Sequence, residues 1–429
     1  MLKTRTIPCY LVLACGLLLG HMISAAQLPQ TSFPKLGNEL VDIVEHNFYD
    51  AKRGASWSRS YRHYADQITD AQTFTQKTRA AIDALHSSHT NYYRSTDLAY
   101  AGLLSIFEPV LQPKGFWYDS IGIDVISRVD VISRMDVITR LNLIGNTGVI
   151  GKEDVTGKEE GYFVRAVFAG SPAQKAGLHR GDLLLRADNK PFAPITAFMN
   201  KSDQPVTLQV QRHPHTPPES ITVVPRHIKP TEEWLQAQKE GTRLYSRNQR
   251  RIGYIPFFSG AGENYQQAAQ EAITGPLREA DALILDFRNG FGGFNPNFVS
   301  LFDRNVPRLR MQDREGKNNI VDGHWRKPLY VLINAGSHSG KEVVAFALKK
   351  HHLATLIGEN TGGAVLGGRP FLLSDGSLLY LAVTNGEVDG QRLEGKGVAP
   401  DIEVTDSLAF TQGTDRQLEK ALSLAARKP

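Results

Sequence analysis

The second half of the chain alternates short apolar runs with runs of helical spacing, and this alternation constrains the fold more than any other feature of the sequence. Continuous apolar runs of strand length occur at residues 252–257, 282–287 and 329–334. Residues 265–278 and 341–351 have the apolar spacing of helices. Because strands that alternate with helices build an α/β layer, this half of the chain is predicted to be an α/β domain.

The first part of the chain has a different pattern. Apolar residues such as Leu36 and Leu40 recur at helical spacing within residues 31–110, and this segment is predicted to be helical. The last helix of the segment should end near residues 86–89. A closing helix is predicted at the other end of the chain, over residues 415–427.

Between these parts lies a segment of short strand-like runs. Within residues 115–226, such runs occur at 162–168, 182–187 and 206–212, separated by glycine and proline. This composition predicts a small β-rich module. A chain of 429 residues is also too long for one compact core. The sequence therefore predicts a multidomain α+β protein.

The β-rich segment contains a hexapeptide repeat. The three copies begin at Asp124, Asp130 and Asp136 and together cover residues 124–141. An even period keeps the side-chain phase of a strand and drifts around a helix, so the repeat predicts an elongated strand or a protruding hairpin. Three copies are too short for a solenoid, which favours a local duplication tolerated at the surface over a functional repeat.

The first residues have the pattern of a secretory leader. Lys3 and Arg5 precede an apolar run over residues 9–23, and small residues follow at 24–26. Residues 1–26 are therefore predicted to be a cleavable signal peptide, which directs the protein to a bacterial periplasm or outside the cell. An uncleaved membrane anchor is the alternative, but the run is shorter than the roughly 20 residues that span a bilayer.

Both cysteines, Cys9 and Cys15, lie inside this leader. The mature chain would then have no thiol, which excludes cysteine catalysis and cysteine metal sites. Lipidation at Cys15 remains an alternative to simple cleavage. The net charge of +5 includes Lys3 and Arg5, and the remaining excess is too small to indicate a nucleic-acid partner.

Three segments contain residues suited to catalysis. Ser339 lies between an apolar strand and a helix, where helix N–H groups could stabilise an oxyanion, although a serine in this place usually caps the helix. Residues 286–293 form a glycine-rich turn after another strand, which indicates either oxyanion donors or a flexible turn. His89 follows Ser88 after the helical segment and, taken alone, is best interpreted as a surface histidine.

Together these segments resemble the tail-specific, C-terminal processing peptidases, and within that family the tricorn-like branch. The sequence GSPAQKAGL at residues 170–178 with GDLLL at 181–185 resembles the PDZ signature of these proteases. GENTGGA at 358–364 and EGKGVAPD at 394–401 resemble two later family motifs. The resemblance implies an α/β core of the ClpP/crotonase type, preceded by a PDZ module that captures extended chain ends.

The resemblance also implies a set of catalytic residues. The nucleophile of the Ser-x-x-Glu motif falls on Ser339, with Glu342 as its partner on the helix. The oxyanion donors would be the N–H groups of Gly340 and Gly292, with Gly293 as the alternative if the register differs by one residue.

The general base is implied in the same way. The Ser-His pair of the tricorn-like branch matches Ser88 and His89, and the glutamate of the last motif matches Glu394. A histidine base with its ordinary pKa near 6.5 would make activity rise through roughly pH 6 to 7. The Ser-Lys branch places a lysine where this chain has Ala364, and Lys341 is interpreted as a solvated lysine.

The predicted organisation is a signal peptide at 1–26, a helical segment at 27–114, a PDZ-like domain at 115–226 and a catalytic domain at 227–429. The predicted function is that of an exported serine endopeptidase acting on unfolded or C-terminally recognised polypeptides. No metal or cofactor is expected, because the histidines do not form a ligand pattern. Neither a nucleic-acid partner nor stable membrane insertion after cleavage is expected, and the oligomeric state stays open. A non-catalytic peptide- or ligand-binding protein on the same scaffold is the alternative.

Overall fold

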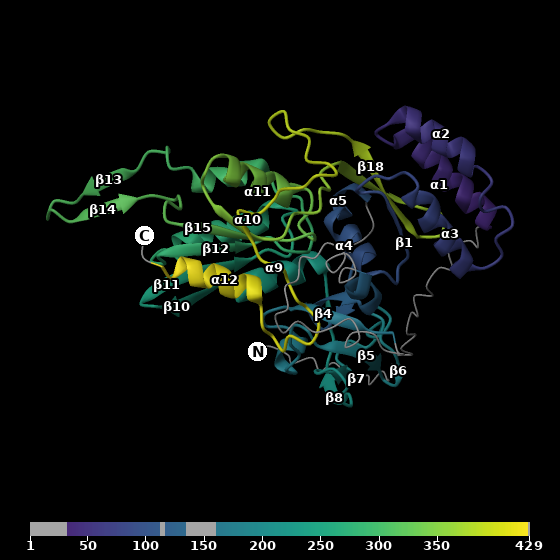
Figure 1. Ribbon diagram of the computed structural model, residues 1–429, viewed down its shortest axis with the longest axis horizontal. Coiled ribbons are helices and arrows are strands. Elements are labelled where there is room, and N and C mark those ends of the chain that lie inside the picture. The colour runs from purple at the N-terminus through teal and green to yellow at the C-terminus, as the bar shows by residue number, and fades with distance from the viewer. Residues whose placement is uncertain (1–31, 112–115, 134–159, 428–429) are drawn as a thin grey trace, which may run out of the picture.

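The computed structural model describes residues 32–111, 116–133 and 160–427. The predicted signal peptide and the last part of the hexapeptide repeat lie outside these residues. Within them, Figure 1 shows three parts: N-terminal helices over a small sheet, a β-rich module, and an α/β core.

The N-terminal part is helical, as predicted. Its helices are α1 (Phe33–Asn47), α2 (Ala51–Tyr61), α3 (Ala71–Asp83), α4 (Leu98–Ile106) and α5 (Glu108–Leu111). Asp50 and Asp70 begin α2 and α3, because each carboxylate accepts a hydrogen bond from a backbone N–H three residues later.

These helices pack on a three-stranded antiparallel sheet that the sequence did not predict. The sheet has the order β1-β18-β17, with β1 at Asn91–Tyr93, β18 at Leu378–Thr384 and β17 at Gly367–Leu372. Leu40, Val44 and Phe74 share one buried cluster with Leu379 and Leu381. Two late strands therefore belong to the core of the N-terminal helices.

The β-rich module is one antiparallel sheet of order β3-β4-β5-β7-β8, with the short β6 (Lys190–Pro191) paired to β5. Its strands are β3 (Ile123–Ser127), β4 (Tyr162–Val167), β5 (Leu183–Ala187), β7 (Val206–Gln211) and β8 (Glu219–Val223). The turn helix α8 (Pro172–Lys175) lies between β4 and β5, and β2 (Tyr118–Ser120) pairs with β9 (Arg226–Ile228). β3 is at the edge of the sheet.

The prediction of an elongated strand or a protruding hairpin through the hexapeptide repeat is wrong for residues 128–133. The chain leaves β3 at Ser127 and residues 128–133 are helical. The Ser127 hydroxyl accepts a hydrogen bond from the N–H of Asp130 at 3.1 Å and donates one to the Asp130 carboxylate at 2.6 Å. A serine followed three residues later by an acidic residue is a helix-starting pattern, and here this local signal overrides the even period.

The α/β core is a six-stranded sheet of order β10-β11-β12-β15-β16-β19. β10 (Arg243–Arg247) is antiparallel to β11, and all other pairs are parallel. The parallel strands are β11 (Arg250–Pro256), β12 (Ala282–Asp286), β15 (Leu329–Ile333), β16 (Thr355–Gly358) and β19 (Ile402–Glu403).

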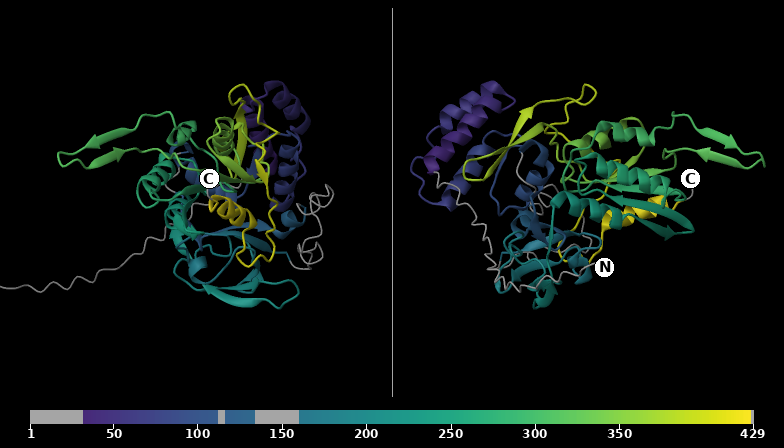
Figure 2. Two further views of the ribbon diagram at one scale, coloured as in Figure 1. Left: turned by 60° about the vertical axis from the view of Figure 1, so that its left-hand side comes forward. Right: turned by 180° about the vertical axis from the view of Figure 1, so that it is seen from behind.

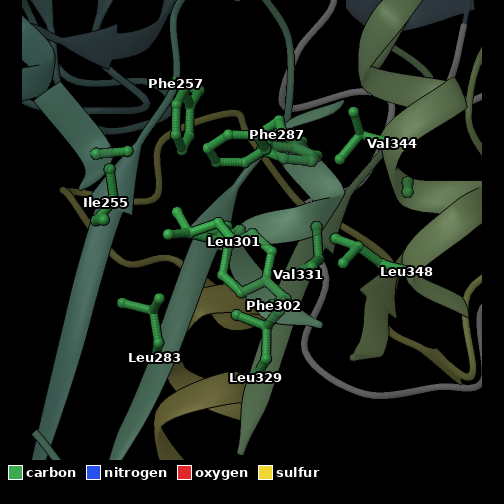
Figure 3. Close-up of a cluster of buried hydrophobic side chains, with 14 of the residues drawn as sticks. Ile255, Phe257, Leu283, Phe287, Leu301, Phe302, Leu329, Val331, Val344 and Leu348 are labelled. Carbon is green, nitrogen blue, oxygen red and sulfur yellow. The ribbon is translucent and has the colours of Figure 1, made fainter. Parts of the chain in front are cut away.

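Helices cover both faces of this sheet. Leu283 and Leu285 face α10 (Glu263–Thr274), α11 (Gly340–Lys350) and the 3₁₀ helix η1 (Pro296–Phe302), as Figure 3 shows for part of the cluster. Ile284, one residue out of phase, packs in the cluster of α12 (Arg416–Ala425). α9 (Pro230–Gly241) leads into the core from the β-rich module. Every residue of β12 is buried, as expected for a parallel strand covered on both sides.

A hairpin of β13 (Leu309–Gln312) and β14 (Asn318–Val321) projects away from the core, as all the views in Figures 1 and 2 show. Among the described residues, no helix is both long and apolar enough to cross a membrane.

The carboxyl ends of β12 and β15 meet at the same edge of the sheet. The glycine-rich turn follows β12, and Ser339 follows β15.

Candidate active site

Ser339 lies in the turn between β15 and α11 and occupies the N-cap position of the helix. Its φ of 57° is in the left-handed region, which is strained for a serine. The Ser339 N–H donates hydrogen bonds to the Ala364 carbonyl at 2.7 Å and to the Glu342 carboxylate at 3.1 Å. The side chain is only half-buried, so the surrounding contacts hold a strained serine at an accessible position.

Glu342 connects the serine turn to the loop after β16. Its buried carboxylate accepts hydrogen bonds from the N–H groups of Gly363 and Ala364 at 2.7 and 2.8 Å, and from the Thr361 hydroxyl. Burial raises the pKa of Glu342, and these hydrogen bonds oppose the shift. Glu342 thus ties the backbone of Ser339 to the backbone of Gly363 and Ala364.

The glycine-rich turn after β12 lies directly against Ser339. A Cβ atom added at Gly292 would lie 2.7 Å from the Ser339 Cβ and 3.0 Å from the Gly340 nitrogen. A Cβ added at Gly340 would lie 3.1 Å from the Gly293 nitrogen. Within the described ranges, no group accepts a hydrogen bond from the N–H of Gly340, Gly292 or Gly293. Backbone donors are therefore available next to the serine, in either predicted register.

His89 follows α3 and is held by a chain of hydrogen bonds that leads to Glu394. The Ser88 hydroxyl donates to the Glu394 carboxylate at 2.9 Å, and the same oxygen lies 3.2 Å from the His89 Nδ1. Since the hydroxyl hydrogen is engaged with Glu394, the Nδ1 must be the donor in the second contact. The neutral His89 then carries its proton on Nδ1 and leaves Nε2 free to accept one.

Glu394 itself is oriented by backbone groups. Its carboxylate accepts hydrogen bonds from the N–H groups of Ser88 at 3.3 Å, Val365 at 2.9 Å and Leu366 at 3.3 Å. These donors come from the turn after α3 and from the segment before β17. The carboxylate therefore joins the N-terminal part of the chain to the core.

The pKa of His89 is lowered from 6.5 to about 4. Burial is the main cause, the neighbouring His338 adds to the shift, and Glu394 opposes it. The ordinary pKa near 6.5 expected from the sequence is thus replaced by a lower one. His338 directly precedes Ser339, so its electrostatic interaction with His89 links the histidine to the serine turn. The His89 ring also lies against Tyr380 of β18, with ring centroids 5.6 Å apart.

Lys341 is not the solvated lysine that the sequence suggested. Its side chain is fully buried, and its Nζ donates hydrogen bonds to the carbonyls of Phe257, at 2.7 Å, and Asn289. Burial lowers its pKa from 10.5 to about 7. The helical spacing of the sequence could have predicted this burial, because Lys341 lies on the same face of α11 as the buried Val344 and Leu348.

The structure therefore brings the predicted site residues together in two groups. Ser339, Gly340, Gly292 and Glu342 meet at the edge of the core sheet. Ser88, His89 and Glu394 form the second group. Among the residues that the structure describes, no cluster of histidine, cysteine, aspartate or glutamate side chains could hold a metal ion.

A cavity of about 820 Å³ lies between the β-rich module and the core. Arg165 and Arg180 line it from the module, and Phe257, Asn289 and Arg288 line it from the core. Neither Ser339 nor His89 is among its lining residues. The cavity therefore reaches the glycine-rich turn at Asn289 without being lined by Ser339.

The structure offers a serine on a strand-to-helix turn, available backbone donors beside it, and a histidine hydrogen-bonded through Ser88 to the Glu394 carboxylate. Serine hydrolases use groups of these kinds. Residues 251–404 match the model of peptidase family S41. The matched residues include Ser339, Glu342 and Glu394, whereas Ser88 and His89 lie outside them.

Two curated relatives are similar over more than half of the chain. The carboxyl-terminal-processing protease of Synechocystis sp. is 27% identical over 277 residues, which cover 61% of this chain and 64% of that protein. The chloroplastic carboxyl-terminal-processing peptidase 2 of Arabidopsis thaliana is 29% identical over 260 residues, covering 56% and 49%. The chain thus matches less than two thirds of the length of either relative.

Among solved structures, the tricorn protease is similar over 92% of this chain and 36% of its own, with 17% identity and a TM-score of 0.50. The photosystem II D1 C-terminal processing protease is similar over 90% and 99%, with 20% identity and a TM-score of 0.48. At this sequence identity, the similarity to the tricorn protease shows a shared fold. The mixed α+β, multidomain architecture predicted from the sequence is therefore confirmed at this level.

Proposed function

We propose that this chain is an exported serine endopeptidase that hydrolyses peptide bonds through an acyl-enzyme. The observation that carries the proposal is the hydrogen bond from Ser88 to Glu394, because it fixes the proton of His89 on Nδ1 and leaves Nε2 as a base. A peptide-binding scaffold has no need of an imidazole prepared in this way.

In the proposed reaction, the Ser339 Oγ attacks the carbonyl carbon of the scissile bond while its proton passes to the His89 Nε2. The carbonyl oxygen becomes an oxyanion, which accepts hydrogen bonds from the N–H groups of Gly340 and of Gly292 or Gly293. When the carbon–nitrogen bond breaks, the leaving amine takes the proton from His89. Water then attacks the acyl-enzyme carbonyl carbon while His89 accepts a proton from it, and the carbonyl oxygen again becomes an oxyanion. The carbon–oxygen bond to Ser339 breaks, His89 returns the proton to the Ser339 Oγ, and the acid product is released.

We propose that Glu394 acts through Ser88. Protonation of His89 during the reaction places a positive charge on the imidazole, and the carboxylate stabilises that charge across the Ser88 hydroxyl. Burial and His338 make the imidazolium unfavourable at rest. The carboxylate therefore favours the charged form that the transition state requires.

The substrates we propose are unfolded polypeptides or exposed C-termini. Two facts support this. β3 is an edge strand of the β-rich module, which we propose is PDZ-like, and an extended chain can add to such an edge by main-chain pairing. The relatives named above are called carboxyl-terminal-processing proteases. Export is proposed from the leader pattern of residues 1–26.

The proposal is tested with a serine-reactive fluorophosphonate probe and an unfolded protein substrate. Wild type should be labelled and should generate peptides that mass spectrometry identifies. Ser339→Ala should lose labelling and at least about 10⁴-fold of kcat while keeping its fold. Ser300→Ala, at an exposed serine, is the control and should match wild type. A wild-type protein that binds unfolded chains but is neither labelled nor active would instead be the non-catalytic binder.

A further inference from the structure

Lys341 is a buried ammonium with no carboxylate among its hydrogen-bond partners. Its side chain is 0% exposed, and both recorded acceptors are backbone carbonyls. Two carboxylates, those of Asp286 and Asp124, are close enough to favour its charge. Asp286, however, is already paired with Arg288 at 2.6 Å. A buried charge without its own counter-ion is expensive, and the core around it would fold more easily with an apolar side chain.

The two carbonyls belong to segments that meet beside the serine. The Phe257 carbonyl lies just beyond the end of β11, and the Asn289 carbonyl lies in the turn that runs on to Gly292 and Gly293. Lys341 itself is in the first turn of α11, two residues after Ser339. One side chain therefore ties the helix that carries the serine to the turn that carries the available backbone donors.

The glycine-rich turn after β12 needs to be held in place, because its backbone has an uncommon conformation. Asn289 has a φ of 54° and Gly290 a φ of 68°, both in the left-handed region. On the other side, the Asn289 N–H donates to the Asn334 side chain at 3.2 Å, and the Asn334 amide donates back to the Asn289 side chain at 3.2 Å. Asn289 is thus held by the side chain of Asn334, directly after β15, and by the ammonium of Lys341 on α11.

We propose that Lys341 is a positioning residue for the oxyanion donors: its ammonium locks the 289–293 turn against α11, so that the N–H of Gly292 or Gly293 lies beside the N–H of Gly340. This role rests on the function proposed above and assigns Lys341 no proton transfer. Removing the ammonium leaves two buried carbonyls without their donor and frees the turn to shift away from Ser339. The oxyanion then loses a donor, while the contacts that bind the rest of the substrate remain.

The test uses Lys341→Met, which keeps the length and volume of the side chain and removes only the ammonium. Its kcat should fall about 10²- to 10³-fold, the loss typical of one oxyanion donor, with KM within about threefold of wild type. Fluorophosphonate labelling should slow in parallel. Lys341→Gln, which keeps N–H donors on a shorter side chain, should retain more activity than Lys341→Met. The matched control is Lys350→Met on the exposed end of the same helix, where the lysine pairs with Asp389.

The pH profile separates positioning from proton transfer. The residual labelling of Lys341→Met should keep the acid limb of wild type, because His89 is untouched. Loss of that limb would make Lys341 the base. A folded Lys341→Met with kcat within twofold of wild type would overturn the positioning role, and so would a Lys341→Met chain that fails to fold, since the lysine would then be needed for the core itself. Failure to label wild type would contradict the proposed peptidase and this role together.

Discussion

The Ser88 hydroxyl donates a 2.9 Å hydrogen bond to the carboxylate of Glu394, a residue 306 positions further along the chain. This contact decides which nitrogen of the adjacent His89 carries the proton. Glu394, Ser88 and His89 therefore have different proposed roles, and each role can be tested by a substitution.

Changing Glu394 should weaken the base without removing it. In Glu394→Gln the amide can donate to Ser88, so the Ser88 hydroxyl can turn toward Nδ1 and favour the wrong tautomer of His89. We expect kcat to fall by between tenfold and roughly 10⁴-fold, the loss seen when a triad carboxylate becomes an amide. His89→Ala should lose more. The measurement is kcat on a short peptide, with the exposed Glu403→Gln as control, and a fully active Glu394→Gln would contradict the relay.

The pH dependence should report the lowered pKa of His89. Since the neutral imidazole is the base and its pKa is about 4, kcat/KM should rise with pH around pH 4 and be level by pH 6. A rise centred near pH 6.5 would mean that the histidine is solvated in the active enzyme. The profile is best measured as the rate of labelling by the fluorophosphonate probe.

The same residue should make folding sensitive to acid. Between about pH 4 and the unfolded value of 6.5, the native state binds fewer protons at His89 than the unfolded state does. The free energy of unfolding therefore decreases as pH falls through this window. In His89→Gln the decrease should be smaller, and denaturant unfolding at pH 4.5 and pH 7 measures the difference. An equal decrease in both proteins would show that other groups cause it.

A methyl group at Gly292 should block the site. The added Cβ of Gly292→Ala would lie 2.7 Å from the Ser339 Cβ, closer than real Cβ contacts, so the turn or the serine must move. We expect at least a 10²-fold loss of kcat, comparable to the loss of an oxyanion donor, in a protein that still folds. Gly323→Ala is the matched control, because its Cβ would meet nothing within 4 Å. Wild-type kcat in Gly292→Ala would remove this glycine from the site.

Deleting the β-rich module should affect long substrates most. If β3 captures extended chains, removal of residues 115–226 should reduce cleavage of unfolded proteins more than cleavage of short peptides. The comparison is the ratio of kcat/KM for the two substrates in wild type and in the deletion. Equal losses would indicate that the module activates the core or supports its folding, a possibility consistent with the ring contact of Phe168 with Phe258 at 4.5 Å.

Regular periodicity made most of the fold predictable. The strands 252–257, 282–287 and 329–334 and the helix after Ser339 were found because each has a simple apolar pattern. The sheet of β17 and β18 was not predicted, because nothing in the local sequence indicates that these strands pack on the N-terminal helices. The helix at 128–133 was not predicted, because the helix-starting hydrogen bonds of Ser127 outweigh the even period of the repeat.

The candidate site was predictable only through motifs. The sequence placed Ser339, Ser88, His89 and Glu394 in separate segments, and only the fold brings the last three into one hydrogen-bonded chain. Lys341 was misjudged because a lysine in sequence suggests solvent, whereas its position on the apolar face of α11 decides its burial. The hydrogen-bond acceptors of Lys341 are backbone carbonyls. Every residue has a backbone carbonyl, so the residue types in the sequence could not indicate these contacts.

Glu394 and β18 come late in the chain, and this order has a consequence during synthesis. A nascent chain that has emerged as far as α11 already holds Ser339 and His89, but it lacks the carboxylate that orients the base and the strand that carries Tyr380. In the proposed mechanism, the base therefore stays incomplete until the segment with Glu394 docks against Ser88. Completion of the polypeptide would then act as the activation step of the proposed peptidase.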